Sequence, residues 1–165
     1  MTIRYSTVGI VGTGAMGRGI AQIAAQAGST VQLFDLNPEA CRQAHAAITA
    51  QWDKLQDKGR IDAATADAYK TRLQTAASLG NLHNCDLVVE AAVERLDIKQ
   101  SLFAQLEDIV RPDAVLVTNT SSLSVTAIAA GLKRPAQFAG YHFFNPVPLM
   151  KVVEVIAGLK TETAV

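Results

Sequence analysis

The segment YHFFNPVPLMKVVEV, residues 141–155, carries three side chains that can take part in proton transfer or hydrogen bonding. His142 is followed by Asn145 and later by Glu154. A histidine titrates near neutral pH, and a carboxylate hydrogen-bonded to one of its ring nitrogens leaves the other nitrogen free as a general base. A single histidine in an apolar run is also common as a packed core residue, so the segment by itself leaves both interpretations open.

A second candidate site is a glycine pattern near the N-terminus, Gly12-Thr13-Gly14-Ala15-Met16-Gly17. It follows an apolar run and opens a stretch with helical spacing, which is the setting of a dinucleotide-binding loop. In such a loop Gly12 permits the tight turn, Gly14 lets a pyrophosphate approach backbone N–H groups, and Gly17 allows helix and strand to pack closely. The alternative is that these glycines serve only the turn and the packing.

Asp35 closes the second expected strand, as the dinucleotide-binding pattern requires. A carboxylate at this position accepts hydrogen bonds from the hydroxyls of the adenosine ribose, and it repels the additional phosphate of NADP. The pattern therefore predicts NAD as the cofactor. Alternatively, Asp35 caps the segment that follows it.

Apolar runs typical of buried strands alternate along the chain with stretches of helical spacing. Strands are expected at 7–11, 30–34, 87–89, 115–117 and 138–143. Helices are expected at 15–27, 38–57, 62–73, 97–110 and 125–130. The second and third helices, with Asn37 as N-cap and Gly59 between them, form a helical hairpin.

This alternation predicts an α/β fold: a Rossmann-type, doubly wound and mainly parallel sheet, with the helical hairpin inserted after the second strand. Pro146 and Pro148 turn the chain, and residues 151–156 are expected to return as an antiparallel strand near the C-terminus. That strand would bring Glu154 beside His142. Ligands of open α/β sheets bind at the carboxyl ends of the strands, and His142 is expected near such an end.

Composition limits the possible partners. Fifteen basic and fifteen acidic residues cancel, which gives no electrostatic support for nucleic acid or an anionic membrane as partner. The apolar runs are shorter than the ~20 residues of a membrane helix, and we see no signal peptide or CxxC spacing of Cys41 and Cys85. We therefore expect a single-domain, cytoplasmic protein. Neither His45 nor His83 has a cysteine or histidine partner at a useful offset, so no metal is expected.

Four stretches together resemble the nucleotide-binding domain of L-3-hydroxyacyl-CoA dehydrogenases, including 3-hydroxybutyryl-CoA dehydrogenases. They are GTGAMGRGIA, VVEAAVERLDIK, TNTSSLSV and GYHFFNPVPLMKVVEV. The resemblance covers essentially the whole chain, and HFFNPVPLM is its most specific part. It implies that residues 1–165 form an NAD-binding domain of an enzyme that oxidises (S)-3-hydroxyacyl-CoA reversibly to 3-oxoacyl-CoA, as in fatty acid β-oxidation.

The resemblance also implies roles for individual residues. His142 would be the general base that takes the proton of the 3-hydroxyl group, while hydride passes from C3 to the nicotinamide, and Glu154 would orient it. Ser121 and Asn145 match residues that hydrogen-bond substrate and nicotinamide. For the TNTSS stretch the alternative is a turn in which Ser122 or Ser124 caps a helix.

Other matches concern the cofactor and the CoA moiety. Glu94 and Lys99 match positions beside the bound cofactor, although a helix-entry carboxylate and an exposed lysine are the ordinary alternatives. Lys54 and Lys58 lie in the hairpin that approaches CoA in the family, where a cation pairs with phosphate. A solvated helix face is the alternative for both lysines. Ala15 and Met16, which belong to the glycine loop, are also expected to contact the cofactor.

One departure from the family pattern concerns domain organisation. The family has a second, mostly helical domain that closes over the acyl-CoA and forms much of a homodimer interface, and this sequence ends at Val165 without it. A homodimer is expected for the full-length enzyme. Two other functions stay open: an enzyme of another hydroxyacid dehydrogenase group, which leaves HFFNP unexplained, and a non-catalytic protein, as with the lens crystallin that resembles this family.

Overall fold

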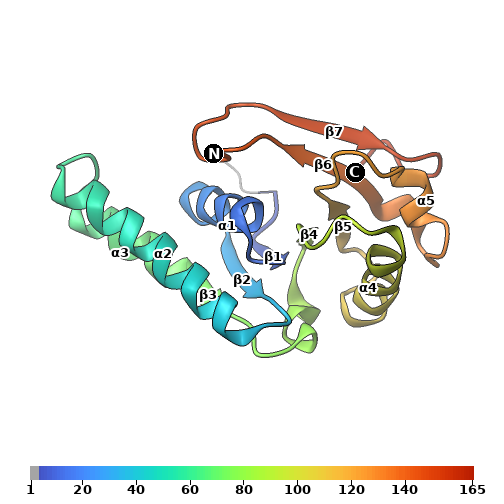
Figure 1. The fold of residues 1–165 in the computed structure, drawn as a ribbon, viewed down its shortest axis with the longest axis horizontal. Coiled ribbons are helices and arrows are strands. Elements are labelled where there is room, and N and C mark those ends of the chain that lie inside the picture. Colours follow the sequence, from blue (N-terminus) through green and yellow to red (C-terminus); the bar gives the residue numbers. More distant parts are fainter. Residues whose placement is uncertain (1–3) are drawn as a thin grey trace.

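The computed structural model describes residues 4–165. Its strands are β1 (Thr7–Val11), β2 (Thr30–Phe34), β3 (Leu73–Thr75), β4 (Leu87–Glu90), β5 (Val115–Thr118), β6 (Phe138–Phe143) and β7 (Val153–Ala157). They form one sheet in the order β3-β2-β1-β4-β5-β6-β7, shown in Figure 1. Neighbouring strands are parallel except for β6 and β7, which are antiparallel. The predicted Rossmann-type sheet and its return strand are confirmed.

Helices connect the parallel strands. They are α1 (Ala15–Ala27), α2 (Pro38–Asp57), α3 (Ala63–Arg72), α4 (Leu96–Ile109) and α5 (Val125–Ala129), with the 3₁₀ turns η1 (Leu79–Asn84) and η2 (Pro135–Gln137). The predicted helices agree with these bounds to within one residue. No helix in the described part, residues 4–165, has the length and apolar character needed to cross a membrane.

The sequence-based prediction missed β3 and placed the start of the return strand two residues too early. Leu73 was expected to end the third helix, but it pairs with Val31 and opens a strand of three residues. So short a strand has no measurable alternation, and its pairing with the edge of β2 forms it. At the return strand, the N–H groups of Leu149 and Met150 both donate to the carbonyl of Pro146, which prolongs the turn and delays the strand.

Two apolar clusters hold helices against opposite faces of the sheet. Ile10 on β1 packs in one cluster with Ile20 from α1 and Trp52 from α2. Val11, the next residue of β1, packs in the other cluster with Phe103 from α4. Successive side chains of a strand point to opposite faces, so the near-continuous apolar run of β1 is what a sheet covered on both sides requires.

The predicted helical hairpin is present. The side chain of Asn37 caps α2 by accepting hydrogen bonds from the N–H groups of Glu39 and Ala40. Gly59, with a φ of 65°, lies in the turn between α2 and α3. In Figure 1 the hairpin extends at the left of the sheet, on the side opposite to β6 and β7.

Candidate functional site

The glycine loop follows β1 directly, and two of its glycines are required by the backbone. Gly12 has a φ of 94°, and a Cβ atom there would lie 2.6 Å from the carbonyl oxygen of Ala91. A Cβ atom on Gly17 would lie 1.9 Å from the carbonyl oxygen of Gly12. The start of α1 therefore packs against the turn itself, which is closer than the helix–strand contact that the sequence pattern predicts.

Gly14 differs from Gly12 and Gly17, because a Cβ atom at this position would meet open space. Apart from its chain neighbours and its own helix, no heavy atom of residues 4–165 lies within 4 Å of the Cβ position of Gly14. Gly14 is the N-cap of α1. The first turn of this helix, which lies within the described residues, carries no acidic side chain. Exposed N–H groups at such a helix end attract phosphate. This end of α1 therefore fits a pyrophosphate group.

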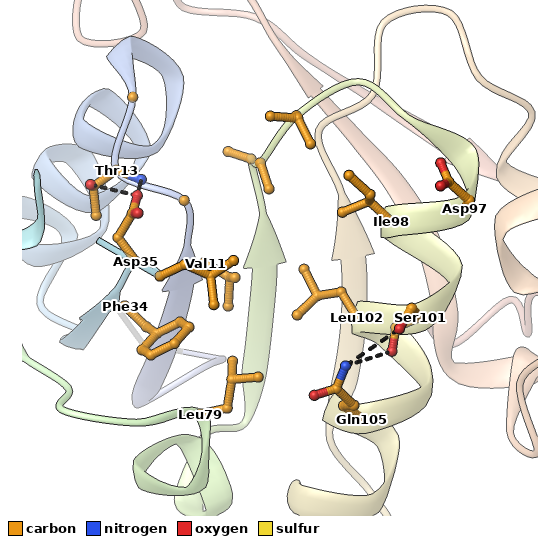
Figure 2. A pocket seen from close by; sticks show the side chains of 16 residues that line it. Val11, Thr13, Phe34, Asp35, Leu79, Asp97, Ile98, Ser101, Leu102 and Gln105 are labelled. Atoms are coloured by element: carbon orange, nitrogen blue, oxygen red, sulfur yellow. Dashed lines mark hydrogen bonds between the residues drawn. The ribbon is translucent and has the colours of Figure 1, made fainter. Parts of the chain in front are cut away.

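A cavity of about 950 Å³ extends from this loop between β2 and α4. Figure 2 shows Asp35 and Thr13 on one side of it and Ile98 and Leu102 on the other. We call it the loop pocket. Phe34 adds an apolar side chain to its wall. A pocket with apolar walls and a carboxylate at one end fits an adenosine, whose base is flat and whose ribose carries hydroxyl groups.

Asp35 is held in place by the loop and by the next helix. Its Oδ2 accepts hydrogen bonds from the N–H and the hydroxyl of Thr13, both at 2.8 Å, and its Oδ1 accepts one from the N–H of Asn37 at 3.0 Å. Partial burial raises the pKa of Asp35, but these hydrogen bonds outweigh it and lower the pKa below its usual value. The carboxylate stays charged at neutral pH. Asn37, and not Asp35, supplies the side-chain cap of α2.

A second cavity, of about 380 Å³, lies at the carboxyl ends of β4, β5 and β6. Ala91 and Ala92 line both this cavity and the loop pocket, so the two are neighbours. We call it the histidine pocket. Six of the predicted site residues line it: Met16, Glu94, Lys99, Ser121, His142 and Asn145. The fold thus brings together residues that are up to 129 positions apart in the sequence.

His142 and Glu154 face each other across β6 and β7. They are directly opposite in the antiparallel register, and Nδ1 of His142 lies 2.8 Å from Oε2 of Glu154. The ring of Phe144 packs edge-on against the imidazole at 4.7 Å between centroids. A carboxylate at Nδ1 favours a proton on that nitrogen. Within residues 4–165, Nε2 makes no hydrogen bond, which leaves it available for proton transfer.

A third recess, of about 360 Å³, is also lined by His142. Ser121, His142 and Glu154 line it together with the start of α5 and with Ile156 on β7. We call it the serine recess. Ser121 and His142 line both the histidine pocket and the serine recess. A ligand in one cavity would therefore meet a ligand in the other beside these two side chains.

Glu94 fixes the backbone of the serine turn. Its Oε1 accepts hydrogen bonds from the hydroxyl of Thr120 and from the N–H groups of Ser121 and Ser122. Partial burial acts to raise the pKa of Glu94. The hydrogen bonds from Thr120 and Ser121 and the nearby Lys99 have a larger, opposite effect, and the pKa is lowered to about 2. Glu94 stands at the entry of α4, as one alternative described, but its carboxylate bonds the serine turn and does not cap the helix. Ser124 is the helix cap, since its side chain accepts from Ala127 N–H.

Lys99 is not the exposed lysine that one alternative described. Its side chain is 1% exposed, and Nζ lies 2.6 Å from Oε1 of Glu90 and 3.3 Å from Oε2 of Glu94. Lys99 sits in the first turns of α4, and α4 packs against the sheet. The spacing of apolar residues in the sequence could not predict that Lys99 is buried. Its burial depends on carboxylates from β4 and from the loop after β4, which lie beside its ammonium group only in the folded chain.

Lys54 and Lys58 lie outside these cavities. Both are exposed, at the end of α2 and in the turn after it, and neither lines any of the three cavities described above. Ala15 opens α1 and lines a separate depression beside Asn145 and the proline segment. A contact of the lysines with CoA stays a prediction.

Three residues at the site were not singled out from the sequence. Thr13 holds Asp35, and Oδ1 of Asn119 accepts the N–H of Phe143 at 2.9 Å, which ties the end of β5 to β6. Glu90 is fully buried at the end of β4. The available signal was a charged residue ending an otherwise apolar strand.

Within residues 4–165, no group of three or more His, Cys, Asp and Glu side chains is arranged to hold a metal ion.

Comparisons with known proteins agree with this geometry. Residues 7–165 match the family model described as 3-hydroxyacyl-CoA dehydrogenase, NAD binding domain. The chain is 46% identical to 3-hydroxyadipyl-CoA dehydrogenase of Escherichia coli over 165 residues, which are 100% of this chain and 35% of that protein. It is 47% identical to a probable 3-hydroxybutyryl-CoA dehydrogenase of Deinococcus radiodurans over 161 residues, which are 94% of this chain and 56% of that protein.

Solved structures give the same result. A crystal structure of 3-hydroxybutyryl-CoA dehydrogenase from Escherichia coli superimposes with a TM-score of 0.95 at 44% identity, over 98% of this chain and 34% of that one. The (S)-3-hydroxybutyryl-CoA dehydrogenase of Ralstonia eutropha gives 0.92 at 39% identity, over 97% of this chain and 56% of that one. This chain spans between a third and just over half of these relatives. With its glycine loop, its Asp35 and a family match over residues 7–165, the chain belongs to the family of the NAD-binding domain of 3-hydroxyacyl-CoA dehydrogenases.

Proposed function

We propose that this chain supplies the cofactor site and the proton-transfer residues for the NAD-dependent oxidation of (S)-3-hydroxyacyl-CoA to 3-oxoacyl-CoA. The observation that carries the proposal is the position of His142. It lines both the histidine pocket and the serine recess, and Glu154 is hydrogen-bonded to its Nδ1. A base between two cavities suits a reaction in which a cofactor and a substrate meet.

In the proposed arrangement, the loop pocket and the histidine pocket together bind NAD. Asp35 accepts hydrogen bonds from the adenosine ribose, and the N-terminus of α1 at Gly14 binds the pyrophosphate. Ser121 and Asn145, which line the histidine pocket, hydrogen-bond the nicotinamide end and the substrate. NAD, when bound, accepts the hydride that leaves C3 of the substrate.

The proton of the 3-hydroxyl group goes to Nε2 of His142. Glu154 stabilises the resulting imidazolium and keeps the ring in the orientation that presents Nε2. The products are 3-oxoacyl-CoA, NADH and one proton, so two electrons and two hydrogens are accounted for. In the reverse direction the protonated His142 returns its proton to the carbonyl oxygen.

The remaining parts of the proposal concern what lies beyond the cofactor site. We expect a mostly helical second domain to cover the serine recess and the acyl-CoA, as the family pattern implies, and a homodimer in the cytoplasm. Lys54 and Lys58 would pair with CoA phosphate if that moiety reaches the hairpin. The second domain, the homodimer and the CoA contacts rest on the resemblance, and the cytoplasmic setting rests on the sequence composition.

Reduction of acetoacetyl-CoA by NADH, followed by the absorbance of the cofactor, tests the proposal. The chain is measured alone and joined to the expected helical domain. Catalysis by the two-domain protein, and turnover at least about a hundredfold lower from the chain alone, is the expected result, because positioning of the reactants accounts for much of such a barrier. NADH binding without turnover by either protein would favour a non-catalytic protein on the same fold.

A further inference from the structure

A buried ion cluster borders the histidine pocket, and the proposed reaction does not use it. Lys99 lies between Glu90 and Glu94, at the 2.6 Å and 3.3 Å distances given above. Glu90 is 0% exposed and Lys99 is 1% exposed, so solvent screens their charges little. Lys99 and Glu94 are themselves part of the pocket wall.

The hydrogen bonds show that the cluster carries a net negative charge. Glu90 accepts at both carboxylate oxygens: Oε1 from Lys99 and from the N–H of Ala92 at 2.7 Å, and Oε2 from the hydroxyl of Thr118 at 2.6 Å. Glu94 likewise accepts from N–H and O–H donors. An ammonium group within 2.6 Å of Glu90 and 3.3 Å of Glu94 favours the charged form of both carboxyl groups. Two anions and one ammonium leave a net charge of −1.

This charge acts on the two redox states of NAD unequally. An oxidised nicotinamide ring is a cation, whereas the reduced ring is neutral. Resting on the proposed function, which puts the ring in the histidine pocket, we infer that the net charge of this cluster, to which the fully buried Glu90 contributes, sets the relative affinity for NAD⁺ and NADH. A unit charge about 8–12 Å away, at an effective dielectric constant near 20, corresponds to about a 10- to 30-fold ratio in affinity.

Glu90 is suited to this role because it cannot turn away from the pocket. It stands at the end of β4, its carboxylate is tied to α4 and β5, and its own carbonyl accepts the N–H of Asn119. Its charge therefore keeps the same position whether or not a ligand is bound, which is the condition for a preorganised electrostatic effect. Glu94, which is 38% exposed on its side chain, is held less completely.

Glu90→Gln in the 165-residue chain tests the inference. NADH affinity is measured by titration of cofactor fluorescence, and NAD⁺ affinity by displacement of NADH. We expect NAD⁺ affinity to fall about 10- to 30-fold relative to NADH, because one negative charge is lost while the side chain keeps its shape. Glu107→Gln is the matched control. Glu107 is a buried carboxylate on the same helix as Lys99, about 12 Å further along it, where it accepts the N–H of Lys133.

An unchanged affinity ratio in a folded Glu90→Gln chain would overturn the inference, as would an equal change in Glu107→Gln. If Glu90→Gln does not fold, Glu94→Gln carries the test, since it removes the same charge from a partly exposed position. An unchanged ratio there would also reject the inference. NADH binding by the unsubstituted chain is a separate result: its absence would reject the proposed cofactor site itself, whereas its presence supports that site whatever the ratio does.

Discussion

The sheet region beside the loop pocket, called here the nucleotide end, and the region beside His142 and Glu154, called the histidine end, are covered to different degrees. β1, an interior strand beside the loop pocket, is enclosed on both faces, with Ile10 0% and Val11 4% exposed. β7, beside the His142–Glu154 pair, is an edge strand in which every residue is exposed, and Val155 reaches 61%. A row of apolar side chains on an edge strand marks an interaction surface. The nucleotide end is thus complete within the chain, whereas the histidine end holds its polar groups in place and leaves an apolar strand uncovered.

The largest expected effect is on the histidine end alone. In a protein that carries this chain and the expected helical domain, His142→Gln should lower turnover by ~10²–10⁴-fold, because the general base is lost. NADH affinity should change little, since the loop pocket is untouched. Steady-state assay and fluorescence titration measure the two quantities. Near-normal turnover would return His142 to the role of a packed core residue.

A pair of glycine substitutions probes the nucleotide end. Gly17→Ala should lower the free energy of unfolding by about 2–4 kcal/mol, because its Cβ atom would overlap the Gly12 carbonyl. Gly14→Ala meets no such contact and should cost less than about 1 kcal/mol, but it should weaken NADH binding by about tenfold or more. Urea denaturation and NADH titration separate the outcomes. Equal stability losses in both variants would mean that the loop is arranged differently.

The pH dependence of stability tests the contacts of Glu94 with the serine turn and with Lys99. The pKa of Glu94 in the folded chain is about 2, against an ordinary 4.5, so its contribution to stability is present above about pH 4.5 and is lost as the pH falls toward 2. Glu94→Gln should therefore be less stable than the unsubstituted chain at neutral pH, by about 1–2 kcal/mol after allowance for its partial exposure. Denaturation at pH 7 and pH 3 should show the difference shrinking. A constant difference would exclude this charge as its cause.

Coenzyme choice depends on Asp35. The chain should bind NADH at least about tenfold more tightly than NADPH, because the charged carboxylate repels a ribose phosphate, and Asp35→Asn should reduce this preference. Fluorescence titration with both coenzymes measures it. Equal affinities in the unsubstituted chain would show that Asp35 does not contact the ribose.

The smallest effects are expected in the helical hairpin, away from both ends. Lys54→Ala and Lys58→Ala should change the free energy of unfolding by less than about 0.5 kcal/mol, since both side chains are exposed. NADH affinity should stay within about twofold, and the KM for acyl-CoA should rise about two- to threefold if the lysines pair with phosphate. An unchanged KM would assign them to a solvated helix face.

Local sequence patterns by themselves determined most of the fold and the nucleotide end. The glycine loop, the Asn37 cap and the apolar strands act over a few residues, so their periodicity and spacing identify them. The exception, β3, is three residues long and owes its form to pairing with β2.

Only the tertiary structure decided which charged groups lie close together. The register of β6 and β7 puts His142 opposite Glu154, and packing of α4 on the sheet buries Lys99 beside Glu90. A lysine that is solvated on an isolated helix becomes fully buried here because carboxylates from β4 and from the loop after it surround its ammonium group. Such an arrangement depends on segments from different parts of the chain, and no local spacing of residues encodes the burial of a charge.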